Sequence, residues 1–220
     1  MMASGSVKFH PDFLSLGMGP AMCLFRYLCS FVSLLLIALP AQAEIKAKVV
    51  EKTYSIPGTT GIALYEAIGA HGPRVRDGAS GAIATTNFDL KWGRDYKAEG
   101  NDCVLSVIRP FLTITYTFPK PSETLPPDLR ARWEHFIKGI RAHEAVHGRY
   151  VTEMAEEIHE ATLGFRQPDD PTCQKIRQTI QVPIKAAFDR YKARNQAFEQ
   201  VEMQEGGNVH QLILGLVNGP

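Results

Sequence analysis

The sequence predicts an α+β fold, in which a small, mostly antiparallel sheet is followed by a helical half, within one domain of a 220-residue chain. Two patterns support this prediction. Between residues 48 and 118, apolar and polar residues alternate with a period of two, which is typical of half-buried strands. From residue 129 to about residue 201, apolar residues recur with a period of 3.6, which is typical of amphipathic helices. A proline-rich linker, residues 119–127, separates the two halves.

Four segments of the first half are expected to be strands: Lys48–Ile56, Thr86–Trp92, Cys103–Arg109 and Phe111–Phe118. In the last of them, large apolar side chains alternate with threonines, so we expect the threonines to face solvent. Pro110 either breaks the last two strands apart or marks an edge of the sheet. A short helix, Gly61–Ile68, is expected after the first strand, because Thr59 or Thr60 can cap its start.

The second half predicts two long helical stretches. The first, Leu129–Leu163, is either one helix or two, with Gly139 as its weakest point. A loop, Gly164–Pro171, follows it. The second stretch covers residues 172–201, and Pro183 is expected to kink it or to start it afresh.

The first 43 residues are expected to form an N-terminal extension that ends in a secretory signal peptide. The uncharged apolar run Phe31–Leu39 is too short to span a bilayer, Arg26 precedes it, and Ala41 and Ala43 form a small-residue cleavage pattern. We therefore expect cleavage after Ala43 and a periplasmic or secreted protein with no stable membrane span. The alternative is an N-terminal membrane anchor that is never cut.

The mature chain is expected to contain one domain, residues 44–205, and a tail, residues 206–220, which carries an isolated apolar patch. Within the domain, the sheet-rich part ends at residue 119 and the helical part begins at residue 127. The whole chain has a net charge of only +1 and lacks a basic stripe, so no nucleic-acid partner is expected.

The cysteines also relate to the cellular compartment in which the protein is expected. Signal cleavage would remove Cys23 and Cys29 and leave Cys103 and Cys173. In an exported chain these two most simply form a disulfide with each other, whereas two free thiols are the alternative. The wide separation of the pair excludes a redox motif of the CxxC type and indicates a structural cross-link.

Residues 143–147 read His-Glu-Ala-Val-His and lie within the first helical stretch. On a helix, His143 and His147 lie one turn apart on the same face, so both imidazoles can bind one metal ion, for which Zn²⁺ is well suited. Glu144 could act as the catalytic base, which accepts a proton from the attacking water and later passes it to the leaving amine. The alternative is a surface helix with solvated histidines, but the apolar neighbours Ile140 and Val151 indicate an inward-facing stretch.

A hydrolytic zinc site needs a third protein ligand, so that water can occupy the fourth position. The extended pattern HExxHxxGxxH is absent, because Tyr150 and Glu153 occupy its glycine and histidine positions. If the two helical stretches pack antiparallel about a loop centred near Pro168, Asp189 lies opposite His147 and becomes the first candidate. The alternative role of Asp189 is a surface salt bridge.

Other residues are secondary candidates. Tyr191 falls in the same zone as Asp189 and could donate a hydrogen bond to an oxyanion. The weaker ligand candidates are proposed only because their side chains can bind a metal: Glu153, Glu157, His159 and His210. His159 lies about 160° round the helix from His143, so it is expected to face away.

These residues resemble a family of bacterial proteins described as predicted secreted zinc-dependent proteases (domain of unknown function 922). The resemblance covers roughly residues 54–196. It rests on pieces that occur in the order found in the family: Tyr54, His71-Gly72-Pro73, Trp92, Cys103, Tyr116-Thr117-Phe118-Pro119, Trp133, Phe136, the run from Arg141 to His147, and Cys173. The resemblance implies a zincin-like fold, export and a metalloprotease role.

The chain departs from the family pattern at one place. The family tends to carry a Tyr-Asp pair followed within a turn or two by Thr-x-His-Gly. Phe188-Asp189 matches the start of this pattern, whereas Arg194 and Asn195 stand where His-Gly is expected. If that histidine is the third ligand of the family, this chain has lost it or replaces it with Asp189.

The leading functional prediction is therefore an exported zinc metallopeptidase acting on a peptide or protein substrate. We expect an extended peptide to pair with an edge strand of the sheet, for which the Thr-rich segment Phe111–Phe118 is the candidate. The alternative is a non-catalytic envelope binding protein with a structural or vestigial zinc site. A third, weaker hypothesis is a metal-dependent amidase acting on cell-wall peptide, which would use the same chemistry.

Overall fold

The computed structural model describes residues 45–74 and 81–218, all of which belong to one compact unit, residues 42–220. The predicted signal peptide, residues 1–43, lies outside the described residues. The described part confirms the predicted α+β class: a small sheet is followed along the chain by helices.

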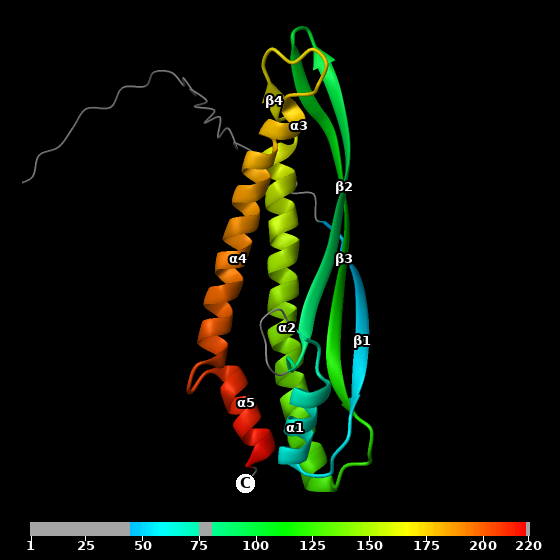
Figure 1. Cartoon of the computed structure of the whole chain (residues 1–220), viewed down its shortest axis with the longest axis vertical. Helices are drawn as coiled ribbons and strands as arrows, with labels where there is room; N and C mark the ends of the chain where they lie inside the picture. The colour runs from blue at the N-terminus through cyan, green and yellow to red at the C-terminus, as the bar shows by residue number, and fades with distance from the viewer. Residues whose placement is uncertain (1–44, 75–80, 219–220) are drawn as a thin grey trace, which may run out of the picture. The chain divides into compact units, whose positions relative to one another are not determined.

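The sheet contains three long strands and one short one: β1 (Lys48–Ile56), β2 (Thr85–Glu99), β3 (Asp102–Pro121) and β4 (Arg166–Gln167). Their order is β1-β3-β2, and β4 pairs with the start of β3 (Figure 1). Because β1 runs parallel to β3 whereas β2 and β4 run antiparallel to it, the sheet is mixed rather than mostly antiparallel.

The pairing of β3 on both sides corrects two expectations. β1 pairs with residues 113–121 of β3 and β2 pairs with its opposite side, so the segment Phe111–Phe118 is in the centre of the sheet and offers no free edge there. Pro110 does not interrupt β3, because β1 pairs with β3 only from Thr113 onward and the missing N–H can face this unpaired side. Within the described residues, β2 pairs only with β3, so the outer side of β2 is an open edge.

The described residues form five helices: α1 (Gly61–His71), α2 (Pro127–Thr162), α3 (Ile176–Thr179), α4 (Gln181–Met203) and α5 (Asn208–Val217). Helix α2 is a single helix of 36 residues. Gly139 does not break it; a Cβ atom there would lie 2.4 Å from Leu212 Cδ1, so glycine allows α5 to approach α2 closely. Pro183 starts α4 afresh, because in the first helical turn its missing N–H is not required.

Helix α2 packs against β2 and β3 and also against α4 and α5, and Figure 1 shows it between the sheet and these helices. Near its N-terminal end, Phe136 and Ile140 join the largest apolar cluster, together with Leu212 and Leu216 of α5. The apolar patch of residues 206–220 is thus the buried face of α5. Further along α2, Val151 packs in a second cluster that includes Leu112 and Ile114 of β3. The two clusters hold the middle of α2 in a fixed orientation. None of the described helices is long and apolar enough to cross a membrane.

The predicted disulfide between Cys103 and Cys173 is present and joins residues 70 positions apart. It ties the start of β3 to the segment that connects α2 with α4. In the same segment, the buried Asp170 carboxylate accepts hydrogen bonds from the backbone N–H groups of Gln174 (2.8 Å) and Ile176 (2.9 Å). Because this segment has a folded structure of its own, α4 begins at Gln181 rather than near residue 172.

Replacing both cysteines (Cys103→Ala with Cys173→Ala) is expected to lower the free energy of unfolding by about 4 kcal/mol, since the cross-link closes a loop of 70 residues in the unfolded chain. Urea denaturation of the oxidised protein and of the double variant measures the difference. Reduced unsubstituted protein serves as the control and should match the variant. A loss below ~1 kcal/mol would contradict the expected role of the cross-link.

Candidate metal centre

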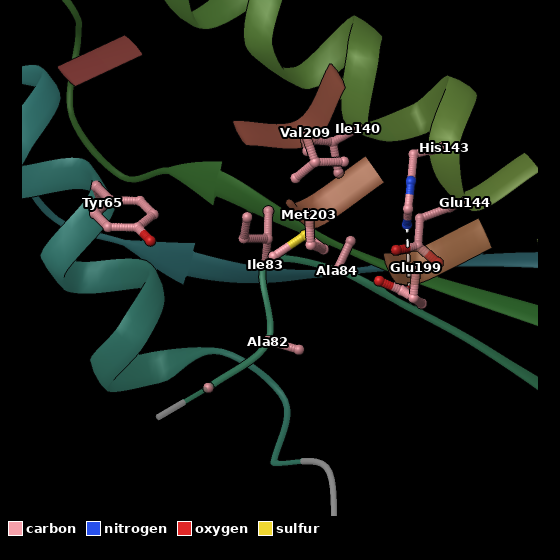
Figure 2. A pocket seen from close by; sticks show the side chains of 11 residues that line it. Tyr65, Ala82, Ile83, Ala84, Ile140, His143, Glu144, Glu199, Met203 and Val209 are labelled. Carbon is pink, nitrogen blue, oxygen red and sulfur yellow. Dashed lines mark hydrogen bonds and ion pairs between the residues drawn. The ribbon is translucent and has the colours of Figure 1, made fainter. Parts of the chain in front are cut away.

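Helix α2 turns the residues of the HExxH pattern inward. His143, Glu144 and His147 are 6%, 6% and 8% exposed, so the alternative of two solvated histidines on a surface helix does not describe this protein. His143 and Glu144 face Glu199 of α4 across a narrow space (Figure 2). The i, i+4 spacing and the packing of α2 between sheet and helices produce this orientation together.

Three atoms of the site lie at mutual distances suited to one metal ion. The Nε2 atoms of His143 and His147 are 3.1 Å apart, and Glu199 Oε1 lies 3.4 Å from the first and 2.9 Å from the second. For ligands bound tetrahedrally at 2.0–2.1 Å, the distance between neighbouring ligand atoms is about 3.3 Å. Within the described residues, these three side chains form the group with metal-binding atoms close enough to hold an ion.

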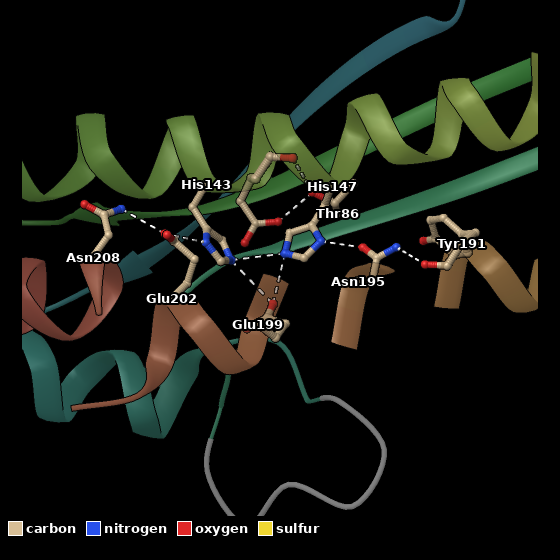
Figure 3. A network of polar contacts seen from close by, with 9 residues as sticks. Thr86, His143, His147, Tyr191, Asn195, Glu199, Glu202 and Asn208 are labelled. Atoms are coloured by element: carbon tan, nitrogen blue, oxygen red, sulfur yellow. Dashed lines mark hydrogen bonds and ion pairs between the residues drawn. The ribbon is translucent and has the colours of Figure 1, made fainter. Parts of the chain in front are cut away.

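Hydrogen bonds on the far side of each imidazole determine which nitrogen faces the site (Figure 3). His143 Nδ1 lies 3.4 Å from the Glu202 carboxylate, which can only accept, so a proton on this nitrogen has an acceptor. His147 Nδ1 lies 2.5 Å from Asn195 Oδ1, while Asn195 Nδ2 donates to the Tyr191 carbonyl at 2.7 Å. When Nδ1 carries the proton, each imidazole directs an Nε2 lone pair toward Glu199, as metal binding requires.

The electrostatics of this arrangement favour a cation. Two Nε2 lone pairs and a carboxylate oxygen that converge within 3.4 Å repel one another unless positive charge lies between them. Without a metal, hydrogen bonds to His143 and His147 lower the pKa of Glu199 to about 2. Burial lowers the pKa of His147, but its contacts with Glu199 and Asn195 outweigh burial and raise that pKa overall. With Glu144 and Glu202 nearby, the site fits a divalent ion.

Glu144 lies beside this group and is held in place by β2. Thr86 Oγ1 donates a hydrogen bond of 2.5 Å to Glu144 Oε2, and it also lies 3.1 Å from the Glu144 backbone carbonyl. Burial raises the pKa of Glu144, although the Thr86 hydrogen bond and the two histidines oppose this. A carboxylate with a raised pKa next to a metal-binding group is suited to exchange protons near neutral pH.

Two cavities meet at the site, and Glu144 and Glu199 line both of them. One cavity, of about 380 Å³, continues along Thr85, Thr86 and Asn87 toward His147, Tyr191 and Asn195. The structure therefore brings Tyr191, the candidate oxyanion donor, to the same cavity as Glu144. The other cavity, of about 240 Å³, extends past His143 toward Ile140 and Met203.

The remaining ligand candidates lie elsewhere. Asp189 forms ion pairs with Lys185 and Lys192, which is the surface salt bridge considered as its alternative. Glu157 pairs with Arg190, and Glu153 pairs with Arg149 and Arg194. His159 lies in the last turn of α2, and His210 Nδ1 on α5 accepts a hydrogen bond from the Gly206 N–H. Glu199 takes the position that we expected for Asp189.

The register between α2 and α4 explains why Asp189 does not lie opposite His147, as we expected, and why Glu199 was missed. The prediction centred the connecting loop near residue 168, but α2 ends at Thr162 and α4 begins only at Gln181. His147 therefore lies opposite Asn195, six residues further along α4 than Asp189 and about 9 Å away along the helix axis. The departure of Asn195 from the family pattern was the one signal in the sequence that marked this part of α4.

Glu202→Ala is expected to weaken zinc binding roughly 10–100-fold, the usual effect of removing the hydrogen-bond partner of a metal-binding histidine. Asn208 Nδ2, at the start of α5, holds the Glu202 carboxylate in position by donating to its Oε2 at 2.9 Å. Zinc titration against a competing chelator measures the change, with the exposed Glu205→Ala as a control. Equal affinity of the Glu202 variant and the unsubstituted protein would show that Glu202 does not orient His143.

The fold and the site define an α+β protein with a group of two histidines and one carboxylate between a long helix and its neighbour. Residues 51–207 match the model of a family described as bacterial protein of unknown function (DUF922), so the chain belongs to that family. No curated protein and no solved structure gives a significant match.

Proposed function

We propose that this protein is an exported zinc-dependent peptidase with a zincin-like site. The observation that carries this proposal is the convergence of His143 Nε2, His147 Nε2 and Glu199 Oε1 within 3.4 Å, with a buried carboxylate, Glu144, beside them. Three protein ligands leave a fourth position for water or substrate, which is the arrangement of hydrolytic rather than structural zinc sites.

His143, His147 and Glu199 would hold the zinc ion, which when bound polarises the scissile carbonyl and lowers the pKa of the attacking water. Glu144 accepts the proton of that water as general base and then donates it to the leaving amine. Thr86 holds the Glu144 carboxylate in place through its hydrogen bond of 2.5 Å. Tyr191, which lines the same cavity, would donate to the developing oxyanion.

The open edge of β2 supplies a place for the peptide. Residues 82–87, which lead into and begin β2, line the cavities on both sides of Glu144. An extended peptide could add to this edge as a further strand and so lie along the site. This replaces the segment Phe111–Phe118, which is in the centre of the sheet.

Two features support export. The apolar run and cleavage pattern before residue 44 have the organisation of a signal peptide. The Cys103–Cys173 disulfide is of a kind that persists in the periplasm or outside the cell and is rare in the cytosol.

The proposal is tested by metal analysis together with peptide hydrolysis. Protein purified from an exporting host is expected to bind about one zinc per chain, and mass spectrometry should detect cleavage of a mixed peptide library. A chelator should stop this cleavage and added zinc should restore it. Zinc binding that raises the melting temperature without any cleavage would contradict the catalytic proposal and favour a structural metal site.

A further inference from the structure

Phe198 of α4 contacts the imidazoles of both histidines in the candidate metal centre. Its ring is nearly parallel to that of His143, with 24° between the two planes and 4.8 Å between the ring centroids. It meets the His147 ring edge to face, at 76° and a centroid distance of 5.2 Å. Phe198 is therefore an apolar neighbour that the two imidazoles share.

Phe198 lies on the stripe of α4 that faces the HExxH turn of α2. Asn195 precedes it by three residues and Glu202 follows it by four, so the three side chains lie on one face of the helix. At the far nitrogen of each ring, Asn195 contacts His147 (Figure 3). In the same way, Glu202 contacts His143. Phe198 stands between these two polar residues on α4 and reaches both imidazoles.

The orientation of His143 depends on this stacked contact. Rotation of an imidazole about its outer side-chain bond has only broad minima, so neighbouring groups must fix the plane of the ring. The 3.4 Å between His143 Nδ1 and Glu202 Oε2 is longer than the usual N–H···O hydrogen bond. Aromatic rings whose centroids are about 4.5–7 Å apart attract one another, so Phe198 restricts the plane that Glu202 leaves loosely held.

Phe198 also covers imidazole surface that the two cavities do not reach. His143 lines the cavity of about 240 Å³ and His147 lines the cavity of about 380 Å³, whereas Phe198 lines neither. Both histidines are buried, and Phe198 is itself partly buried. The Phe198 ring thus keeps water from part of the imidazoles and leaves the cavities, which Glu144 also lines, as the open side of the site.

Tyr150 of α2 holds Phe198 from the outside. The two rings meet at 82° with their centroids 6.0 Å apart, and the Arg194 guanidinium lies 4.1 Å from the centroid of the Tyr150 ring. Tyr150 occupies the position at which the pattern HExxHxxGxxH carries glycine. In this chain α2 continues through that position and contributes an aromatic ring beside the site instead.

We propose that Phe198 is a positioning residue of the metal centre: its ring fixes the imidazoles of His143 and His147 at the spacing of one ion and leaves the centre open only toward the two cavities. This inference rests on the zinc site of the proposed function. It does not depend on which bond the site hydrolyses.

The first test measures zinc affinity by competition with a chelator. Phe198→Ala is expected to weaken zinc binding at least about 10-fold, the lower end of the usual effect of changing a residue that supports a metal ligand. Phe198→Tyr keeps the ring and should bind zinc as the unsubstituted protein does. Phe188→Ala is the matched control, because Phe188 is an aromatic residue of α4 whose ring pairs with Tyr191. Equal affinity of Phe198→Ala and the unsubstituted protein would overturn the proposal.

Cobalt substitution separates positioning from a merely structural role. The visible absorption of bound Co²⁺ depends on its coordination geometry, and four-coordinate sites absorb more strongly than sites with additional water ligands. At saturating Co²⁺, Phe198→Ala should absorb more weakly than the unsubstituted protein, because loosened ligands admit water. Phe198→Tyr should restore the spectrum. A loss of zinc affinity with an unchanged cobalt spectrum would overturn the proposal, since Phe198 would then only stabilise the fold.

Circular dichroism and the melting temperature of the metal-free variants check that they are folded. If Phe198→Ala does not fold, Phe198→Leu replaces it, because leucine keeps most of the apolar volume but has no flat ring. The same loss of zinc affinity and of cobalt absorption is expected. A leucine variant with the affinity and spectrum of the unsubstituted protein would overturn the proposal.

These readouts also distinguish this inference from the proposed peptidase function. Zinc binding that depends on Phe198, without hydrolysis of any peptide, would support the inference and contradict the peptidase. Hydrolysis and zinc binding that are both unchanged in Phe198→Ala would overturn the inference and leave the peptidase standing. If the unsubstituted protein bound neither zinc nor cobalt, both proposals would fail.

Discussion

Glu144→Gln is expected to lower kcat/KM for peptide hydrolysis by a factor on the order of 10²–10⁴, which is what a positioned general base contributes. Glutamine has the shape of glutamate, and its Oε1 can still accept the hydrogen bond from Thr86. It cannot accept a proton from water, however, so the proposed chemical step loses its base. The zinc content should not change, because Glu144 is beside the group formed by His143, His147 and Glu199 and not part of it.

Peptide hydrolysis and bound zinc are measured on the same preparations of this variant. Glu153→Gln provides the matched control on α2, because Glu153 pairs with Arg149 and Arg194 away from the site. The control should retain the activity and the zinc content of the unsubstituted protein. If the Glu144 variant kept more than about a tenth of the activity, another group would have to serve as the base.

Glu199→Gln is expected to have the largest effect on metal binding among the carboxylates of α4. Loss of a ligand should weaken zinc binding by more than the roughly 10–100-fold that follows loss of a partner of a ligand. The carboxylate provides the anionic oxygen that lies 2.9 Å from His147 Nε2, and a neutral amide oxygen is a much weaker donor to Zn²⁺. Zinc-dependent hydrolysis should fall together with affinity.

Asp189→Asn is the decisive comparison for Glu199, since Asp189 is on the same helix and was the ligand candidate by register alone. Its ion pairs with Lys185 and Lys192 are on the surface, so the substitution should leave zinc affinity unchanged. Competition titrations with a zinc chelator measure both variants. Normal affinity in the Glu199 variant together with a loss in the Asp189 variant would reverse the assignment.

Local patterns in the sequence predicted the elements well where burial follows a regular period. The first strand was predicted as Lys48–Ile56, and these are the bounds of β1. In β3, Leu112 and Ile114 are 4% and 3% exposed, as the alternation with threonine indicated. The period of two or 3.6 reports which face of one element is buried, and it does not report which strand pairs with which. The parallel pairing of β1 with β3 was therefore not predicted.

The candidate site likewise contains residues that the sequence could predict and residues that it could not. His143, Glu144 and His147 are close in sequence, and helical geometry places them together, so the motif could be found without a structure. Glu199 and Asn195 reach the histidines from another helix, at a register set by the segment between α2 and α4. That segment contains β4, the disulfide, the Asp170 hydrogen bonds and α3. No periodic pattern in the sequence predicts the distance that such a segment spans.

From the sequence alone came the α+β class, the helix that carries the two histidines, the pairing of the two cysteines and a testable chemistry. These depend on residues that are near one another along the chain or on simple rules of composition. Only the tertiary structure decided that Glu199 completes the group, that Glu202 and Asn195 contact its histidines, that Thr86 holds Glu144 beside it, and that two cavities adjoin it. The reason is that these contacts arise from the packing of α4, α5 and β2 around α2, and packing depends on the whole chain at once.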